Sequence, residues 1–541
     1  MPFHPIHLAQ TATARGWSKA VGPAQKDAQI INGVFEVAQN NLLGTKTVYV
    51  SKRWGSTTGS TIGTDPILLK HYSNLFGTLY QANSGNVYSG TTNWGAAGSF
   101  MAVSTNYVIP DLIVGSLGIL SWVLAGVGWY VYSDADTVTF PTFTGTTTNA
   151  SAVVTTITDT TGIYSGQLVS AAAGITGGTR VLTVDSATQI TMDANATATG
   201  ARTITREAIA KVLDADYPAN AVSVTSMDGY FFVGTSTGRI YQSAINDPAT
   251  YDSADFISAD YSGDGIFTIF KHQNYIVASG NRNTIQYFYN AGNPSGSVLS
   301  AADSLTVVGL RNVKSGPIEY DGAKYLYMET SDPDSSGKGQ MGLYRLTGTN
   351  TFQRVSDDVW SSIISDSGGT LLGTILSAGK QLLVLHSAGD TSDCIVYDSS
   401  VNGFTIFSII FTSAHGASFT KSLQSDSFTW ATGNTWTDSS AAYTLTIQTE
   451  PQDMNNGMDA TDTWADLLAD TESSGTTALD YTDDDYATWN PFGAGTFDMT
   501  VNKKRITGGG THNIRAYRLT HSANTGFRAQ ILRINHVKGD V

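Results

Sequence analysis

The chain has 541 residues and a formal net charge of -15, with 14% charged residues, 10% aromatic residues and 55 glycines. This acidic balance excludes a general nucleic-acid-binding surface, which needs cationic groups to displace counterions from phosphate. Few Lys and Glu residues among many Thr, Ser, Tyr and Gly residues disfavour long helices and favour strands joined by tight turns. We therefore predict an all-β chain, long enough for more than one domain.

Residues 1–56 are predicted to form an N-terminal arm. Residues 30–37 and 46–50 are strand candidates, and we expect terminal strands of this kind to close a ring of sheets. The first 40 residues have no apolar core after a basic start, so they do not look like a signal peptide. The single cysteine, Cys394, excludes an intramolecular disulfide framework and fits a reducing compartment during synthesis.

Residues 57–138 are predicted to form the first part of a β-propeller, with blade-like strands at 77–88 and 126–134. Within this part, residues 112–132 carry no charge over 21 residues and imitate a membrane span. Interleaved glycines and tryptophans, and the absence of flanking Lys or Arg, favour instead two buried strands with a turn near Gly126.

Residues 139–203 differ in composition, since they are rich in Thr, Ala and Gly and nearly lack aromatic and charged residues. Their alternating apolar residues predict a small β-sandwich-like domain inserted into a blade loop, where insertions are tolerated. A low-complexity disordered loop is the alternative, which the regular Gly and Val spacing disfavours.

Residues 204–420 are predicted to form the second part of the propeller. One strand-turn-strand unit recurs here four times, at Tyr230, Tyr275, Tyr325 and Leu382, which are 45, 50 and 57 residues apart. This spacing is typical of propeller blades, each of which buries both faces only by stacking on its neighbours. We predict six or seven blades.

Residues 421–541 are predicted to form a C-terminal β region with two opposite charge strips. The acidic strip, residues 422–502, has 14 Asp and Glu residues and no Lys or Arg; the basic strip, residues 503–541, has eight Lys and Arg residues. Either the strips pair within one β-domain, or one faces an acidic partner subunit while the other lines a path for a polyanion.

The chain shows no catalytic signature and no metal or cofactor motif. Residues 482–489 resemble an Asp-box, the Ser-x-Asp-x-Gly-x-Thr-Trp turn of sialidase propellers, with Tyr486 in the Gly position; this turn is structural and remote from catalysis. Residues 480–485 lack the Gly turn and distal Glu of an EF-hand, and the nine histidines are scattered. We expect no enzyme activity, no catalytic residues, no cofactor and no metal site.

Several segments resemble the tail hub proteins of short-tailed phages (podoviruses), also called nozzle or packaged-DNA stabilisation proteins. The likeness covers most of residues 25–139 and 205–535, and residues 139–203 depart from it. The segments that carry it are residues 227–231, 240–243, 247–256, 285–292, 481–489 and 515–524.

This resemblance implies a structural virion protein that forms a ring, expected to be a homohexamer, below the portal and adaptor. Such a ring would retain packaged DNA and form the channel for its ejection, in contact with tailspike or fibre and needle or plug proteins. Double-stranded DNA would pass without specific binding, because an acidic lumen repels phosphates. The chain would lie in the virion tail, after assembly in the bacterial host cytoplasm, and would not span a membrane.

We assign candidate surface roles to ten residues of the two strips. The candidate channel-lining acidic residues are Asp453, Asp459, Asp462, Asp466 and Asp470. The candidate partner-contact basic residues are Lys503, Lys504, Arg505, Arg515 and Arg518. Charge reversal of the acidic group to Lys is expected to change genome ejection.

Two other functions stay open. The chain is alternatively a glycan-binding or glycan-cleaving β-propeller, for example a receptor-binding virion component, or a membrane-associated or secreted bacterial propeller. Glycosidase assays and glycan arrays separate the first alternative from a tail hub, which is expected to be inert in both.

Overall fold

The computed structural model consists almost entirely of β-strands, which confirms the predicted all-β class. The structure describes residues 3–9, 29–40, 45–58, 69–73, 78–82, 86–89, 92–96, 111–114, 117–124, 126–133, 142–259, 261, 263, 265–280, 284–312, 317–333, 339–356, 360, 370–377, 380–386, 394–408, 414–418, 421–424, 428–430, 436–438, 441–484 and 486–538. The chain divides into two compact units. The first unit comprises residues 1–61, 319–322 and 354–541; the second comprises residues 62–318 and 323–353.

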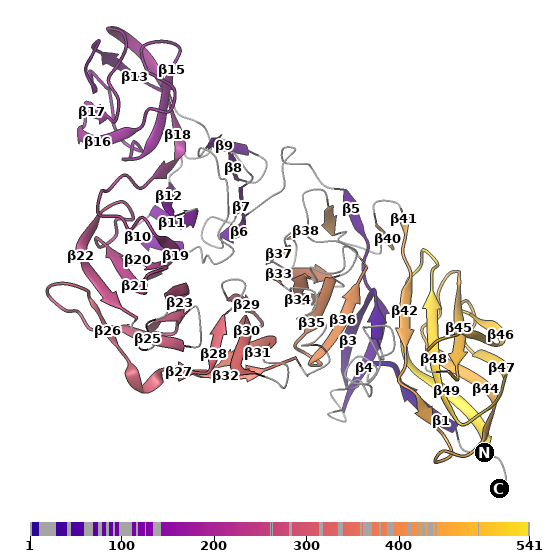
Figure 1. Ribbon diagram of the computed structural model, residues 1–541. Helices are drawn as coiled ribbons and strands as arrows, with labels where there is room; N and C mark the ends of the chain where they lie inside the picture. Colours follow the sequence, from indigo (N-terminus) through magenta and orange to yellow (C-terminus); the bar gives the residue numbers. More distant parts are fainter. Residues whose placement is uncertain are drawn as a thin grey trace. The chain divides into compact units, whose positions relative to one another are not determined.

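The described part of the second unit contains five antiparallel sheets with the strand order of propeller blades (Figure 1). The first three sheets are β6 (Leu69–Ser73), β7 (Thr78–Ala82), β8 (Asn86–Ser89) and β9 (Thr92–Ala96); β10 (Asp111–Val114), β11 (Leu117–Leu124), β12 (Val127–Ser133) and β18 (Gly200–Lys211); and β19 (Ala221–Met227), β20 (Tyr230–Thr235), β21 (Arg239–Ser243) and β22 (Tyr251–Ser258).

The fourth and fifth sheets complete this series. They are β23 (Ile266–His272), β24 (Tyr275–Gly280), β25 (Thr284–Asn290), β26 (Leu299–Ala301) and β27 (Val307–Val308), with the 3-10 turn η2 (Asp303–Leu305); and β28 (Leu310–Asn312), β30 (Ala323–Pro333), β31 (Gly339–Thr347) and β32 (Thr351–Arg354). A short strand, β29 (Ile318–Tyr320), spans the position in the sequence at which the second unit ends, after residue 318, and the first unit resumes, at residue 319.

Successive sheets of the second unit stack face to face, because neighbouring residues of a strand point to opposite faces. On β20, Phe231 packs in a core shared with the second sheet, whereas Phe232 packs in a core shared with the fourth. On β24, Ile276 faces the third sheet and Val277 faces the fifth. Both faces of these strands are buried, which explains why they read as continuous apolar runs rather than alternating patterns.

Three of the four recurring units predicted from sequence, at Tyr230, Tyr275 and Tyr325, lie on β20, β24 and β30 of these sheets, and the fourth, at Leu382, lies on β34 (Lys380–His386) of the first unit. Before β20, Asp228 and Gly229 have φ of 54° and 87°, the paired left-handed conformation of a type I′ turn. The uncharged stretch 112–132 forms the hairpin β11–β12 with Gly126 at φ 80° in its turn. The prediction of two buried strands is therefore confirmed for this stretch.

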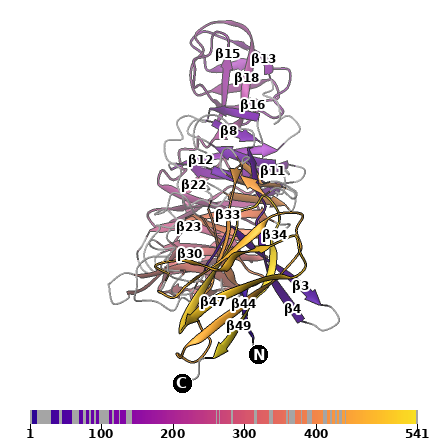
Figure 2. The same cartoon turned by 90° about the vertical axis from the view of Figure 1, so that its right-hand side faces the viewer.

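Strands between residues 142 and 203 form a small cluster with its own core, built on the outer strand of the second sheet. The strands are β13 (Thr142–Thr147), β14 (Val153–Thr155), β15 (Gln167–Ala171), β16 (Val181–Ser186) and β17 (Gln189–Met192). Strand β18 is long enough to pair with β12 near Lys211 and with β13 at residues 200–205. Figures 1 and 2 show the cluster projecting from one end of the second unit. Its core includes Val154, Val181, Ile190 and Ile204, all fully buried.

Two more blade-like sheets lie in the first unit. They are β33 (Thr370–Ser377), β34 (Lys380–His386), β35 (Cys394–Asp398) and β36 (Gly403–Phe407); and β37 (Ala414–Ser418), β38 (Lys421–Gln424), β39 (Phe428–Trp430) and β5 (Ser56–Thr58). In the second of these, an N-terminal strand completes a sheet whose other strands come from far along the chain. The N-terminal strand β5 is the outer strand of this sheet, next to β39. A two-stranded ribbon follows, made of β40 (Thr437–Asp438) and β41 (Ala441–Ala442).

The remaining strands of the first unit form two sheets around one large core. One sheet contains β1 (Phe3–His7), β3 (Gly33–Asn40), β4 (Thr45–Lys52), β49 (Arg528–Lys538), β44 (Ala460–Ala469) and β47 (Lys504–His512). The other contains β2 (Gln29–Ile31), β42 (Leu445–Gln448), β43 (Gln452–Asp453), β48 (Ile514–His521), β45 (Thr476–Thr482) and β46 (Asn490–Asp498), and it continues into the sheet β33–β36 through the parallel pairing of β2 with β36. Strands β44, β47 and β49 run side by side (Figure 2). We call this part the C-terminal sandwich.

The N-terminal strands are thus part of the C-terminal sandwich as well as of the sheet formed by β37, β38, β39 and β5. Ile6, Ile30, Phe35 and Val50 lie in its core together with residues from the last hundred positions of the chain. Such pairing joins segments roughly five hundred residues apart, so it depends on tertiary burial rather than on local pattern.

Candidate functional site

The acidic and basic strips meet as cross-strand pairs inside the C-terminal sandwich. Asp466 on β44 lies directly opposite Arg505 on β47, and Arg505 Nη2 is 2.5 Å from Asp466 Oδ2. Asp480 on β45 lies opposite Arg518 on β48, with 2.9 Å between Nη2 and Oδ2. Opposite charges at directly facing positions stabilise a sheet.

Aromatic rings cover the same guanidinium groups. The guanidinium carbon of Arg505 lies 3.8 Å from the ring centroid of Trp464, and that of Arg518 lies 4.3 Å from the ring of Trp489. Each arginine therefore has a carboxylate at its edge and a π-face beneath it, an arrangement that Arg makes better than Lys. Charges neutralised in this way add little to the long-range attraction of a polyanion.

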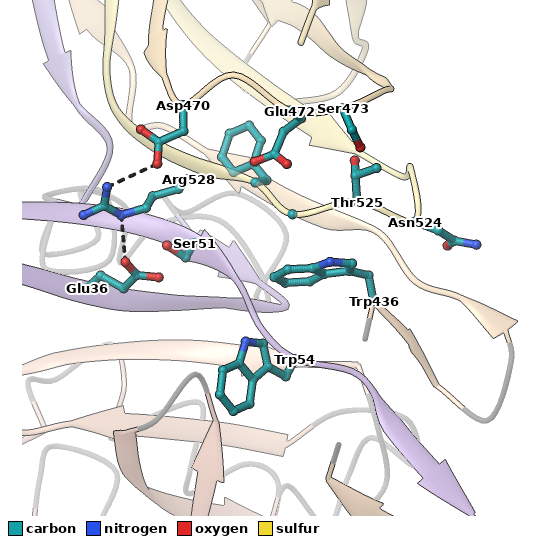
Figure 3. A pocket seen from close by; sticks show the side chains of 12 residues that line it. Glu36, Ser51, Trp54, Trp436, Asp470, Glu472, Ser473, Asn524, Thr525 and Arg528 are labelled. Carbon is teal, nitrogen blue, oxygen red and sulfur yellow. Dashed lines mark hydrogen bonds and ion pairs between the residues drawn. The ribbon is translucent and has the colours of Figure 1, made fainter. Parts of the chain in front are cut away.

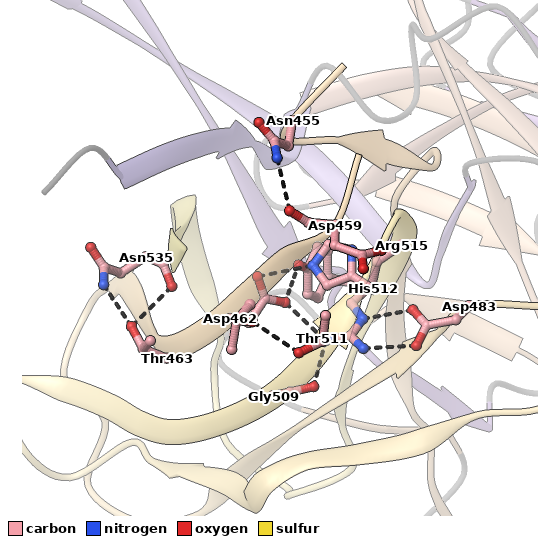
Figure 4. A network of polar contacts seen from close by, with 12 residues as sticks. Asn455, Asp459, Asp462, Thr463, Asp483, Gly509, Thr511, His512, Arg515 and Asn535 are labelled. Carbon is pink, nitrogen blue, oxygen red and sulfur yellow. Dashed lines mark hydrogen bonds and ion pairs between the residues drawn. The ribbon is translucent and has the colours of Figure 1, made fainter. Parts of the chain in front are cut away.

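A buried polar cluster lies where β44, β47 and β48 meet (Figure 4). Arg515, 1% exposed, donates two hydrogen bonds of 2.7 Å to the Asp483 carboxylate and one of 3.0 Å to Asp462 Oδ2. Tyr517 donates its hydroxyl proton to the same Asp462 oxygen at 2.7 Å. His512 Nε2 lies 3.0 Å from Asp462 Oδ1. Burial, reinforced by the Asp462 charge, raises the pKa of Tyr517 far above its usual value, so this residue stays a neutral donor.

The backbone leaves room for this cluster at the Gly508–Gly510 bulge of β47. A Cβ atom at Gly509 would lie 2.6 Å from the Asp462 side chain, and the carbonyl of Gly509 accepts a hydrogen bond of 2.5 Å from Arg515. Only glycine fits this approach of strand to side chain.

The structure places the ten predicted site residues in different environments. Asp462, Lys504 and Arg515 are at most 2% exposed. Lys504 donates to the carbonyls of Ala469 and Val501 rather than facing solvent. Burial removes these three residues from the surface, which corrects their assignment to channel lining and partner contact.

The other predicted site residues are at least partly accessible. Asp466, Arg505 and Arg518 are committed to the pairs above, and Asp470 accepts from Arg528 at 3.2 Å. Lys503 is exposed.

The exposed carboxylates Asp453 and Asp459 lie at the two ends of a turn. Asp453 Oδ1 accepts from the backbone N–H of Asn455 and Gly457, and the Gly457 bond lowers the pKa of Asp453. The carbonyl of Asp459 accepts a hydrogen bond of 2.8 Å from the Asn455 amide. Neither carboxylate forms an ion pair with a described residue, so these two keep their net charge.

The Asp-box-like segment forms the turn that its pattern predicts between β45 and β46. Asp484 Oδ1 accepts from the Thr482 hydroxyl at 2.7 Å and from the Thr488 backbone N–H at 2.9 Å. Tyr486, in the glycine position, has φ of 65°, and its hydroxyl reaches the Thr449 carbonyl at 2.9 Å. These hydrogen bonds tie the turn to the hairpin.

A pocket of about 700 Å³ opens in the first unit beside the C-terminal sandwich (Figure 3). Sequence reasoning did not find it, because its walls come from four segments that no local motif connects. The described residues that line it are Glu36, Ser51, Trp54, Trp436, Asp470, Glu472, Ser473, Asn524, Thr525, Gly526, Phe527 and Arg528.

Two searches of the described residues bear on metal and membrane binding. Within the described ranges, no group of three or more His, Cys, Asp or Glu side chains is placed to hold a metal ion. In the same ranges, no helix has the length and apolar character needed to cross a membrane.

The chain shows weak similarity to several solved structures. The Neurospora crassa Pan2 WD40 domain is 8% identical, with 70% of this chain and 94% of that chain covered and a TM-score of 0.35. BBS1N in complex with ARL6DN is 11% identical over 70% and 97%, with a TM-score of 0.32. Phage phi92 endosialidase is 11% identical over 92% and 67%, with a TM-score of 0.22. At TM-scores this low, the likenesses say nothing about function. No curated protein matches the chain.

A family model described as Bacteriophage P22 Gp10, beta-propeller, matches residues 144–309. The matched range begins inside the segment 139–203, so the expectation that this segment departs from the family is not supported. Residues 25–139 and 310–535, where the sequence also showed a likeness, lie outside the match. The predicted β-propeller class is confirmed, and residues 144–309 match the model of the phage packaged-DNA stabilisation family.

Proposed function

We propose that this chain is a structural protein of a short-tailed phage tail, of which several copies form a ring below the portal and adaptor. The ring retains packaged DNA and forms the channel through which DNA leaves. The family match over residues 144–309 is the observation that carries this proposal. Rings of identical subunits use heterologous contacts that close by rotation, and six copies are our proposal for this ring.

The fold supports a mechanical role rather than a chemical one. Seven blade-like sheets occur in the described residues, five in the second unit and two in the first. Each sheet that buries both faces on its neighbours resists local opening. The chain reaches this rigidity with one buried cysteine and no disulfide.

The charge distribution supports passage of DNA without binding. Four of the eight basic-strip residues, Arg505, Arg515, Arg518 and Arg528, pair with carboxylates of the acidic strip, and the two strips together still carry more acidic than basic residues. Of the acidic candidates, we keep Asp453 and Asp459 for the channel surface, since they are exposed and lack ion-pair partners in the described residues. Reversal of both to Lys is expected to slow genome ejection, because the duplex would adhere to the wall.

We propose the portal or adaptor, tailspikes or fibres, and a needle or plug as neighbours in the virion, with assembly in the host cytoplasm. A non-enzymatic role fits a family of phage structural proteins. Mass analysis of purified virions and of the isolated chain tests this assignment. The proposal expects the 57.4 kDa chain among virion proteins and, with adaptor present, a closed oligomer. A monomeric chain that cleaves or binds glycans and is missing from virions would support the glycan-binding alternative instead.

A further inference from the structure

The pocket beside the C-terminal sandwich has an excess of negative charge. Its carboxylates belong to Glu36, Asp470 and Glu472, and its one cationic lining residue among those described is Arg528. Arg528 donates to Glu36 at 2.7 Å and to Asp470 at 3.2 Å, and its guanidinium lies 3.8 Å from the ring centroid of Tyr49. Arg528 is therefore fully engaged with two of the three carboxylates.

Glu472 is the third carboxylate, and no described residue forms a hydrogen bond or ion pair with its side chain. Burial and the neighbouring Asp470 charge raise the pKa of Glu472, because both disfavour the anion. A cation placed beside Glu472 would stabilise the anionic form of its carboxylate.

An indole ring lies next to this carboxylate. A Cβ atom built at Gly526 would be 3.2 Å from Trp436 Cζ2 and 3.3 Å from each Glu472 carboxylate oxygen, so ring and carboxylate flank the same small gap. Trp54 forms another part of the wall (Figure 3). Tryptophan faces beside a carboxylate are the surroundings that bind an ammonium or guanidinium group most strongly.

A buried hydroxyl also lacks a partner at this site. Ser51 is 4% exposed, and its Oγ has no hydrogen-bond partner among the described residues. The Oγ atom itself is buried from solvent, so Ser51 shapes the wall and does not contact a bound group. The side-chain amide of Asn524, on the loop before β49, adds a polar contact.

We propose that this pocket binds a lysine or arginine side chain presented by a segment of a partner protein. The cation lies against Glu472 and Trp436, and its aliphatic stem lies toward Trp54. A volume of about 700 Å³ exceeds one side chain and matches pockets that take several residues. Binding requires only the pocket residues, so it succeeds or fails independently of the proposed place of the chain in a virion.

Calorimetric titration of the full chain at low salt tests this site. The probes are blocked tripeptides with a central arginine or lysine and a third with citrulline, which keeps the shape of arginine without its charge. The cationic peptides are expected to bind with a dissociation constant of about 1 mM or tighter, and the citrulline peptide at least about tenfold more weakly. Raising the salt concentration weakens the cationic peptides, because the interaction is screened.

Variants of the full chain locate the binding. Glu472→Gln is expected to weaken the cationic peptides at least about tenfold, and Trp436→Leu about threefold or more. Glu450→Gln, an exposed carboxylate outside the pocket, is the matched control and leaves binding unchanged. No binding at about 10 mM peptide overturns the proposal. The proposal is also overturned if the citrulline peptide binds as tightly as the arginine peptide, or if Glu472→Gln binds the cationic peptides with unchanged affinity. It is overturned as well if neutral oligosaccharides, and no cationic peptide, occupy the pocket.

Discussion

Arg515 Nη1 lies 3.0 Å from Asp462 Oδ2 in the interior of the C-terminal sandwich, where neither side chain is more than 1% exposed. This pair joins the acidic and basic strips at a point that solvent does not reach. For these residues, the strips therefore stabilise the folded domain. The structure shows the first of the two arrangements considered from the sequence, in which the strips pair within one β-domain.

Replacement of Asp462 by Asn is expected to destabilise the sandwich by about 1.5–3 kcal/mol, because Arg515 and Tyr517 lose charge-assisted hydrogen bonds to a buried carboxylate while Arg515 keeps its pair with Asp483. Asp466→Asn is the matched control, since its pair with Arg505 is partly exposed and should contribute about 0–1 kcal/mol. Urea unfolding of both variants measures the difference. Equal losses in the two variants would show that burial of the first pair has no energetic consequence.

Asn32 joins the N-terminal strands to the end of β36 and to the sandwich. Its amide donates to Ser408 Oγ and the Thr444 carbonyl, and its Oδ1 accepts from Arg53 Nε at 2.9 Å. Its φ of 60° is left-handed. Asn32→Ala loses these bonds and strains the backbone, whereas Asn32→Gly loses the bonds alone. We expect both variants to lower the melting temperature. The free energy of unfolding should be about 1 kcal/mol lower for Asn32→Ala than for Asn32→Gly. A variant pair with Gly worse than Ala would refute the backbone contribution.

His521 makes stability depend on pH. Burial, with a smaller effect of the Lys52 charge, lowers the pKa of His521 from 6.5 to about 4. Between these values the unfolded chain binds a proton at His521 that the folded chain excludes, so stability falls as pH falls from 6.5 toward 4. The loss amounts to at most about 3 kcal/mol. Denaturation of the parent and of His521→Gln across this range tests it: the variant should show a smaller slope, and an identical slope would rule out this histidine.

Asp484 changes stability in the same direction as His521, but at lower pH. The Thr482 hydroxyl, followed by the hydroxyl and backbone N–H of Thr488, lowers the pKa of Asp484 from 3.8 to about 2. Its contribution is present above the unfolded value and is lost as pH falls toward 2. In Asp484→Asn, the melting temperature should lie below that of the parent at neutral pH, with a gap that narrows below pH 3.8. A gap that stays constant to the lowest pH would contradict this account.

The propeller sheets could be predicted because their information is local. Aromatic and apolar runs between Gly, Asn and Asp turns, such as the run that follows Asp228, specify a strand and its hairpin within ten residues. The hairpin at Gly126 could be separated from a membrane helix on the same grounds.

The sandwich and the pocket could not be predicted, because their contacts join distant segments. Nothing local indicates that Val50 pairs with Ala529, or that Asp462 faces inward while Asp466 faces outward on the same strand. The charge of the strips was readable in the sequence. Which members are buried depends on the sheet that covers them.

Retention of the packaged genome tests the central claim most directly. A phage with a nonsense codon early in this gene would be grown in a non-suppressing host, and nuclease-protected DNA per particle would be measured. The account predicts particles that package DNA and then lose it, with retention restored when the full chain is supplied. Particles that lack the chain and still keep a full, protected genome would contradict it.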